Sequence, residues 1–208
     1  MFILELFGIV AFAVSGAMVG IEKKADIFGV IFLAIVTSLG GGVVRDMMLG
    51  YLPPRMFTSY IYMALAALSA LVVFADAYIR REKYRQHKDK IDSVFNIFDA
   101  AGLAAFTVSG LDMAADSCGM GSPVLLVALG MTTGIGGGML RDVLTNAMPM
   151  VLRKRIYAVA SLSGALLYYL MLYFGANKMF SAVVSMLFIF AIRMLATKYK
   201  WNLPRADL

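Results

Sequence analysis

Two Arg-Asp pairs lie inside otherwise apolar stretches of the chain, Arg45-Asp46 and Arg141-Asp142. Charges within a membrane span are costly and usually face the protein interior, where they bind each other or line an ion path. Adjacent helical residues point about 100° apart, so we predict that each Arg pairs with another helix and not with its own Asp. Snorkelling to the membrane surface is the alternative, and it suits Arg better than Asp.

Three consecutive glycines precede each pair, Gly40, Gly41 and Gly42 in one case and Gly136, Gly137 and Gly138 in the other. Each Gly in a helix interior costs about 0.8–1 kcal/mol relative to Ala. The triplets therefore predict a break or kink, where helix-end carbonyl and N–H groups face protein or a watery cavity. Close packing is a compatible alternative, because small residues recur every four positions. Three consecutive glycines point in three directions, which favours the break.

Further polar residues stand near these motifs. The hydroxyl candidates can line a pore or bond the preceding helical turn. The two carboxylate candidates are available partners for the arginines, although the sequence does not assign the pairs. The candidates are Thr37, Ser38, Thr132 and Thr133 beside the glycines, with Ser15, Ser109, Glu5 and Asp99 as secondary positions.

Composition defines the class of protein that must position these residues. Of 208 residues, 61% are apolar and 15% charged, and the mean hydropathy is +0.81. Ordinary soluble domains have about 45–50% apolar and about 25% charged residues. Disorder and a soluble single core are therefore excluded. An intrachain disulfide is also excluded, because Cys118 is the only cysteine.

Seven segments have the roughly 20 mostly apolar residues that a transmembrane helix needs. We therefore predict an all-α polytopic membrane protein with seven transmembrane helices in a single membrane domain, residues 1–208. The first span is expected to be a retained helix, because Glu5 stands where a signal peptide would be basic. The predicted spans are Phe2–Gly20, Asp26–Leu49, Met56–Ile79, Val94–Asp112, Ser122–Ala147, Ile156–Gly175 and Met179–Thr197.

Basic residues between the spans predict the orientation. One side has only Arg55 and Lys178, and the other has 14 Lys and Arg residues. Because basic loops stay in the cytoplasm, we expect the N-terminus outside and the C-terminus in the cytoplasm. This distribution also explains the net charge of +6 without a nucleic-acid partner. The 14 residues are Lys23, Lys24, Arg80, Arg81, Lys83, Arg85, Lys88, Lys90, Arg153, Lys154, Arg155, Lys198, Lys200 and Arg205.

The chain contains an internal repeat. Residues 5–16 resemble residues 99–110, with six identities 94 positions apart, and residues 40–46 resemble residues 136–142 at an offset of 96. Repeat one covers about residues 2–79, repeat two about 94–175, and the seventh helix, about 179–197, lies outside. Since three helices are an odd number, the two copies enter the bilayer from opposite sides. Such inverted repeats usually place the working site near the midplane.

Several chemistries are not indicated. His87 is the only histidine and falls in a basic loop, so we predict no metal site, no cofactor and no enzyme activity. Aromatic residues near the span ends indicate an interfacial belt. Those residues are Tyr60, Tyr62, Tyr168, Tyr169, Tyr173 and Trp201.

The seven-span layout and the doubled Gly-Gly-Gly-x-x-Arg-Asp motif resemble prokaryotic members of the trimeric intracellular cation (TRIC) channel family, which are also described as glycine transporters. The resemblance covers roughly residues 2–197. It implies a homotrimer with a pore for potassium and sodium in each protomer, lined by the second and fifth helices bent at the triplets. The animal channels bind phosphoinositide at a Lys-Glu motif. Thr37, Ser38 and Leu39 precede the first triplet here, so that property is not carried over.

The leading hypothesis is a passive channel for monovalent cations in a bacterial inner membrane, with membrane lipid as its surroundings. Carboxylates and helix-end carbonyls suit a dehydrated cation. A carrier for glycine or another small zwitterion is the alternative, with Arg holding the carboxylate and Asp the ammonium. A membrane scaffold without transport is a third possibility, which explains buried charges poorly.

Overall fold

The computed structural model describes residues 1–81, 86, 88–153 and 156–201. Its seven long helices are each long and apolar enough to cross a membrane. The predicted all-α fold with seven spans is confirmed. The long helices are α1 (Phe2–Glu22), α2 (Ile27–Met48), α4 (Tyr60–Ile79), α6 (Lys88–Cys118), α7 (Pro123–Leu144), α9 (Ile156–Tyr173) and α10 (Lys178–Lys198).

Local sequence signals set several helix ends. The Asp26 carboxylate accepts a hydrogen bond from the Gly29 N–H at 2.7 Å and caps the start of α2. The Asn177 side chain accepts from two N–H groups at the start of α10, and Pro123 occupies the first turn of α7. Gly50, just after α2, has a φ of +78°, a conformation that glycine adopts without strain.

The structure adds detail to the predicted spans. Two four-residue helices, α3 (Arg55–Thr58) and α8 (Met150–Arg153), follow α2 and α7 and were not predicted. The predicted span Met56–Ile79 therefore divides into α3 and α4. Helix α6 extends beyond the predicted Val94–Asp112 at both ends, because polar residues continue the helix outside the apolar window that hydropathy detects.

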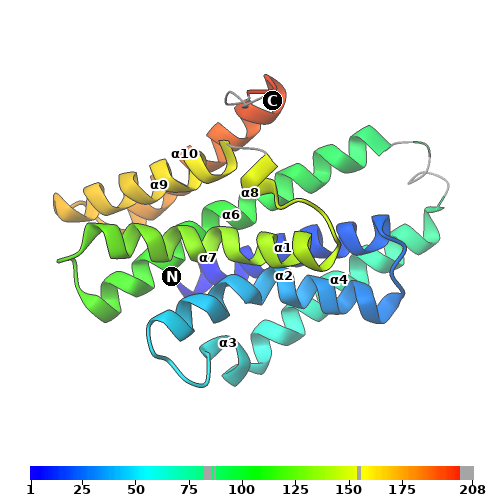
Figure 1. Cartoon of the computed structure of the whole chain (residues 1–208), viewed down its shortest axis with the longest axis horizontal. Coiled ribbons are helices and arrows are strands. Elements are labelled where there is room, and N and C mark those ends of the chain that lie inside the picture. Colours follow the sequence, from blue (N-terminus) through cyan, green and yellow to red (C-terminus); the bar gives the residue numbers. More distant parts are fainter. Residues whose placement is uncertain (82–85, 87, 154–155, 202–208) are drawn as a thin grey trace, which may run out of the picture.

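The same order of elements occurs twice: two long helices, a short helix and a third long helix (Figure 1). Helix α1 contacts α2 and α4, as α6 contacts α7 and α9. Contacts between α1 and α6 and between α2 and α7 join the two halves, while α10 packs on α9 and α6. The C-terminal ends of α2 and α7, which carry the Arg-Asp pairs, lie at opposite ends of the molecule (Figure 1).

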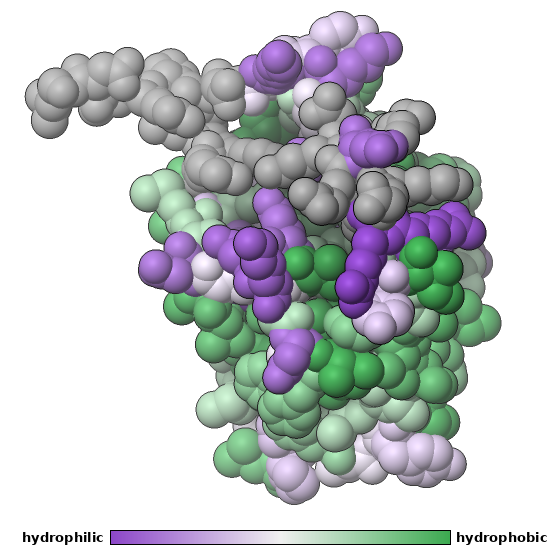
Figure 2. All heavy atoms as spheres, turned by 90° about the vertical axis from the view of Figure 1, so that its right-hand side faces the viewer, coloured by the Kyte–Doolittle hydropathy of each residue, from purple (hydrophilic) through white to green (hydrophobic). Residues whose placement is uncertain are grey.

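Hydrophilic residues gather at the end of the molecule where α1 joins α2 and where α4 and α6 approach each other (Figure 2). This is the end that the basic residues predict to be cytoplasmic, and the orientation stays a prediction. Six residues of that argument and of the metal argument lie outside the described part of the chain. They are Lys83, Arg85, His87, Lys154, Arg155 and Arg205.

The aromatic belt is only partly as predicted. Tyr60, Tyr173 and Trp201 are exposed, as interfacial residues would be. For Tyr62, Tyr168 and Tyr169 the prediction was wrong. These three rings are buried inside the helix bundle, and their hydroxyl groups donate hydrogen bonds there. A tyrosine near a span end can point inward as well as toward the membrane surface, and composition does not separate the two.

Candidate functional site

The glycine triplets lie where α2 and α7 cross, and both helices continue through them. A single helix spans Ile27–Met48 and another spans Pro123–Leu144. The predicted break was therefore wrong, because no helix ends are created at the triplets, while the kink that was the other form of this prediction stays a prediction. The alternative of close packing is what the crossing shows. A Cβ atom at Gly41 would collide with the carbonyl oxygen of Thr133, and one at Gly137 would collide with that of Thr37.

Packing also explains why each run contains three glycines. The middle glycine faces the backbone of the opposite helix, as described above. The third faces a following element: a Cβ at Gly42 would meet Met56 Cε at 2.5 Å, and one at Gly138 would meet the Tyr157 hydroxyl at 3.1 Å. The first faces the partner helix, where a Cβ at Gly136 would lie 3.2 Å from the Cα of Gly41. Each of the three directions in which the glycines point is therefore occupied by a closely packed neighbour.

The hydroxyl candidates beside the triplets bond their own helices. Thr37 and Thr133 donate to carbonyl oxygens one turn earlier, each at 2.6 Å, and Ser38 and Thr132 do the same at 2.8 Å. This is the second of the two roles that the sequence left open for them. A role in lining a pore stays a prediction.

The first charge cluster comprises Glu5, Arg45, Asp46, Arg55 and Tyr62, from α1, α2, α3 and α4. Arg45 Nε and Nη2 both donate to Asp46 Oδ1, at 3.0 and 2.7 Å, and Arg45 Nη1 lies 3.6 Å from Glu5 Oε1. The Tyr62 hydroxyl donates to Glu5 Oε2 at 3.1 Å. The Arg45 and Asp46 side chains are fully buried, and neutrality of the cluster depends on both arginines.

The second charge cluster comprises Asp99, Arg141, Asp142, Tyr157 and Arg193, from α6, α7, α9 and α10. Arg141 Nη1 donates to Asp99 Oδ1 at 2.8 Å, and Arg141 Nε donates to Asp142 Oδ1 at 2.9 Å. Arg193 Nη2 lies 3.6 Å from Asp99 Oδ2, and its guanidinium sits 4.6 Å from the centre of the Tyr157 ring. Two positive and two negative side chains again balance.

The predicted pairing of the arginines was half wrong. Arg45 does bond Asp46, and Arg141 does bond Asp142, because the long arginine side chain folds back to the carboxylate beside it. The expected partners on other helices are also present, since Asp99 binds Arg141 and Glu5 lies near Arg45. Both charged pairs are buried, so the snorkelling alternative does not hold.

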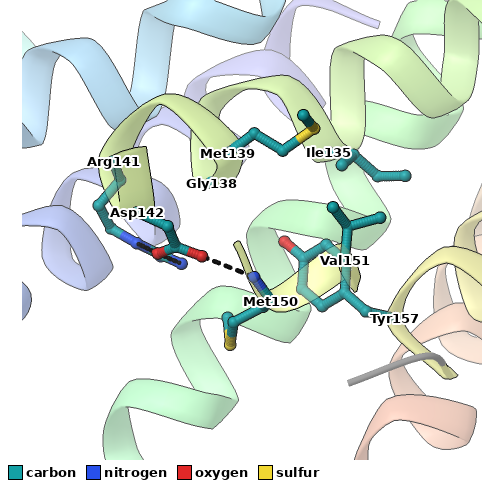
Figure 3. Close-up of a pocket in the computed structure, with 8 residues that line it drawn as sticks. All are labelled: Ile135, Gly138, Met139, Arg141, Asp142, Met150, Val151 and Tyr157. Carbon is teal, nitrogen blue, oxygen red and sulfur yellow. Dashed lines mark hydrogen bonds and ion pairs between the residues drawn. The ribbon is translucent and has the colours of Figure 1, made fainter. Parts of the chain in front are cut away.

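Each Asp of the motif also holds a short helix. Asp46 Oδ2 accepts a hydrogen bond from the N–H of Arg55 at 2.8 Å, and Asp142 Oδ2 accepts from the N–H of Met150, also at 2.8 Å. These N–H groups begin α3 and α8, where a carboxylate is favoured. Figure 3 shows the second case, with Asp142 reaching from α7 to the start of α8.

A narrow crevice beside the second cluster leaves no room for a water molecule (Figure 3). Arg141, Asp142 and Tyr157 form its polar boundary, and apolar side chains from α7 and α8 form the rest. The crevice brings a buried guanidinium, a carboxylate and a phenol close together.

Ser15 and Ser109 have different surroundings. Ser15 Oγ accepts a hydrogen bond from Arg141 Nη1 at 2.6 Å, so α1 is joined to α7 through a charged group. Ser109 is equally buried, and its Oγ has no hydrogen-bond partner in the described chain. The secondary candidates Glu5, Asp99 and Ser15 thus join the clusters directly.

The sequence did not identify four members of the clusters, and Arg55 was assigned only to a loop between spans. Arg193 lies inside the seventh apolar span, and a lone arginine in a span was the signal that should have identified it. Tyr62 and Tyr157 lie near the starts of α4 and α9, and only Tyr62 was considered, as an interfacial residue. Their inward direction becomes visible only in the folded bundle.

A further ionic group joins α6, α9 and α10. Lys178 Nζ lies 2.9 Å from Asp112 Oδ1 and 3.1 Å from Asp116 Oδ1, and the Tyr168 hydroxyl donates to Asp112 at 2.8 Å. Sequence reasoning placed Lys178 in a loop and did not assign it a partner. This group fixes the start of α10 against the end of α6.

The helices and the buried charge clusters define a polytopic membrane protein with a TRIC-like fold. A prokaryotic TRIC channel crystallised in 0.5 M KCl matches with a TM-score of 0.86 and 35% identity, covering 97% of both chains. A TRIC orthologue from Rhodobacter sphaeroides matches with a TM-score of 0.85 and 32% identity, covering 96% of this chain and 98% of that one.

Proteins related in sequence support the same assignment as the solved structures. The family described as "Glycine transporter" matches residues 2–77 and 96–173, and the chain belongs to this family. The UPF0126 membrane protein YvgT of Bacillus subtilis is 35% identical over 206 residues, covering 97% of this chain and 94% of the relative. The UPF0126 inner membrane protein YadS of Escherichia coli is 30% identical over 202 residues, covering 97% and 93%. The resemblance found in the sequence is thereby confirmed, and the matched structures are channels rather than enzymes.

Proposed function

We propose that the chain is a subunit of a homotrimeric channel that conducts potassium and sodium passively, with one ion path inside each subunit. The observation that carries this proposal is the match over nearly the full chain to structures described as cation channels, at 32–35% identity. Cations and a trimer are stated of those proteins and are transferred here. The inner membrane named for the Escherichia coli relative supports the same location for this chain.

We place the ion path between two inverted repeats, near the crossing of α2 and α7. Buried carboxylates stand toward either end of this crossing, Asp46 in the first cluster and Asp142 in the second. Each is neutralised by an arginine, so no free negative charge is left to trap a cation. The glycines allow the two helices to bend and separate without side chains in the way, and bending there is part of this proposal.

Recording from purified protein in planar bilayers tests this function. We expect discrete current steps in KCl and a reversal potential near that of potassium in a KCl gradient. Asp46→Asn and Asp142→Asn should each reduce cation selectivity, because removing the carboxylate charge leaves the positive charge of the neighbouring arginine uncompensated. Unchanged reversal potentials in both variants would exclude these carboxylates as selectivity determinants.

A second candidate is a carrier for glycine. The description of the family favours it, and each cluster offers an arginine and a carboxylate to the two ends of a zwitterion. A carrier would show saturable glycine counterflow in liposomes and no unitary current steps. The channel proposal expects the opposite pair of results.

A further inference from the structure

A hydrogen bond between Arg141 and Ser15 joins the two halves of the molecule. Arg141 Nη1, on α7, donates to Ser15 Oγ, on α1, at 2.6 Å, and both side chains are fully buried. Bonds from a charged donor are shorter and stronger than bonds between neutral groups. This bond therefore holds α1 and α7 together at the second cluster.

The corresponding bond at the first cluster is not made. Ser109 on α6 matches Ser15 at an offset of 94, and Arg45 on α2 matches Arg141 at an offset of 96. Helix α2 contacts α6, as α1 contacts α7. Yet Ser109 Oγ and Arg45 Nη1 are both buried, and neither has a hydrogen-bond partner among the residues that the structure describes. Unpaired buried polar atoms are costly and need an explanation.

The distance between the arginine and the carboxylate on α1 or α6 is also shorter in the second cluster than in the first. Arg141 Nη1 is 2.8 Å from Asp99 Oδ1, whereas Arg45 Nη1 is 3.6 Å from Glu5 Oε1. Arg141 Nη1 thus has two hydrogen-bond acceptors, Ser15 and Asp99, whereas Arg45 Nη1 has none among the described residues. The two corresponding arginine nitrogens therefore differ in their bonding at the two ends of the molecule.

We infer that Arg141–Ser15 and Arg45–Ser109 are two locks in series, one toward each end of the ion path, and that in this structure Arg141–Ser15 is formed and Arg45–Ser109 is released. Ser15 and Ser109 are positioning residues, because they act by holding an arginine and a helix. This inference rests on the proposed channel function. The channel conducts when both locks are released and closes when either one forms.

Single-channel recording in symmetric KCl tests the two locks with Ser15→Ala, Ser109→Ala and the double variant. Ser15→Ala should raise the ratio of open to closed time about ten-fold or more, with the unit conductance unchanged. Ser109→Ala should remove a second class of closures, and the double variant should have the highest open probability. Ser69→Ala is the matched control, because the Ser69 hydroxyl bonds only the carbonyl of Leu65 in its own helix, and it should behave like wild type.

Each departure from these results has a definite meaning. An open-to-closed ratio unchanged by Ser15→Ala in a folded, conducting protein would overturn the lock at the second cluster. Closed-time distributions unchanged by Ser109→Ala, alone and in the Ser15→Ala background, would overturn the lock at the first. A wild-type protein without unitary currents would overturn the channel proposal itself, and with it the locks.

Discussion

The two charge clusters contain the same kinds of residue, two carboxylates, two arginines and a tyrosine, yet they are held together differently. In the first cluster, Arg45 is bound mainly by the neighbouring Asp46, and a tyrosine hydroxyl holds the carboxylate of Glu5. In the second cluster, Arg141 binds two carboxylates and a serine. Two similar sequence repeats therefore do not form the same set of hydrogen bonds.

The seventh helix is one source of this difference. Helix α10 lies outside the repeat and brings Arg193 to Asp99, whereas the second arginine of the first cluster, Arg55, comes from α3. Arg193 is buried, while the Arg55 side chain is 43% exposed and stacks 4.3 Å from the Tyr51 ring centre. The second cluster is thus enclosed by an added helix, and the first stays closer to solvent.

The helix crossing is the part of the comparison in which the two halves should behave alike. Gly41→Ala and Gly137→Ala each force a Cβ against a backbone carbonyl of the other helix, which cannot move away as a side chain can. We expect each to cost more than about 4 kcal/mol or to prevent assembly, as measured by thermal unfolding in detergent. Gly121→Ala is the control, because nothing lies within 4 Å of the added Cβ. A clear difference between Gly41→Ala and Gly137→Ala would break the equivalence of the halves.

The arginines should behave unequally. Arg141→Met removes the partner of two buried carboxylates, and breaking such a buried network costs about 3–5 kcal/mol. Arg45→Met should cost less, about 1–3 kcal/mol, because Asp46 keeps the Arg55 N–H and Glu5 keeps Tyr62. Unfolding of both variants in the same detergent gives the order directly. A larger loss for Arg45→Met would reverse our assignment of the tighter cluster.

Arg193 and Arg55, the second arginine of each cluster, should show the same inequality with smaller losses of stability. Arg193→Met leaves Asp99 Oδ2 buried without its charged neighbour, and we expect a loss of about 2 kcal/mol. Arg55→Met should cost about 1 kcal/mol or less, since this half-exposed side chain is 3.9 Å from Asp46. Urea or thermal unfolding of the two variants measures the difference. Equal losses would show that α10 adds nothing special to the second cluster.

The sequence predicted the long helices and most of the charged residues of the two clusters. The physical reason is different in each case. A membrane span needs a long apolar segment, so the seven long helices were visible, whereas the four-residue α3 and α8 have no such signature. Charges inside spans identified Arg45 and Arg141. The bonds themselves were not predictable, because the reach of an arginine to its neighbour depends on how the side chain folds in the packed interior.

The glycine triplets are a second case in which the sequence alone did not determine the local structure. Helix propensity correctly identifies them as weak points, but packing across α2 and α7 overrides propensity, and the helices continue. The sequence contained the evidence for packing in Gly130 and Gly134, which face the Thr107 region of α6. What it lacked was the neighbour of each glycine, which only the folded bundle supplies.

Substituting the tyrosine of each cluster tests the difference between the two clusters through the smallest expected change in stability. Tyr62→Phe removes a hydroxyl that donates to Glu5, so it should cost about 1 kcal/mol and leave a buried carboxylate oxygen without its donor. Tyr157→Phe removes a buried hydroxyl that has no hydrogen-bond partner within residues 1–81, 86, 88–153 and 156–201, and the ring under Arg193 is kept. Its effect on unfolding should be neutral or slightly stabilising. A loss for Tyr157→Phe as large as that for Tyr62→Phe would mean that the Tyr157 hydroxyl has a partner in the membrane, and the second cluster would then resemble the first more closely than its bonds indicate.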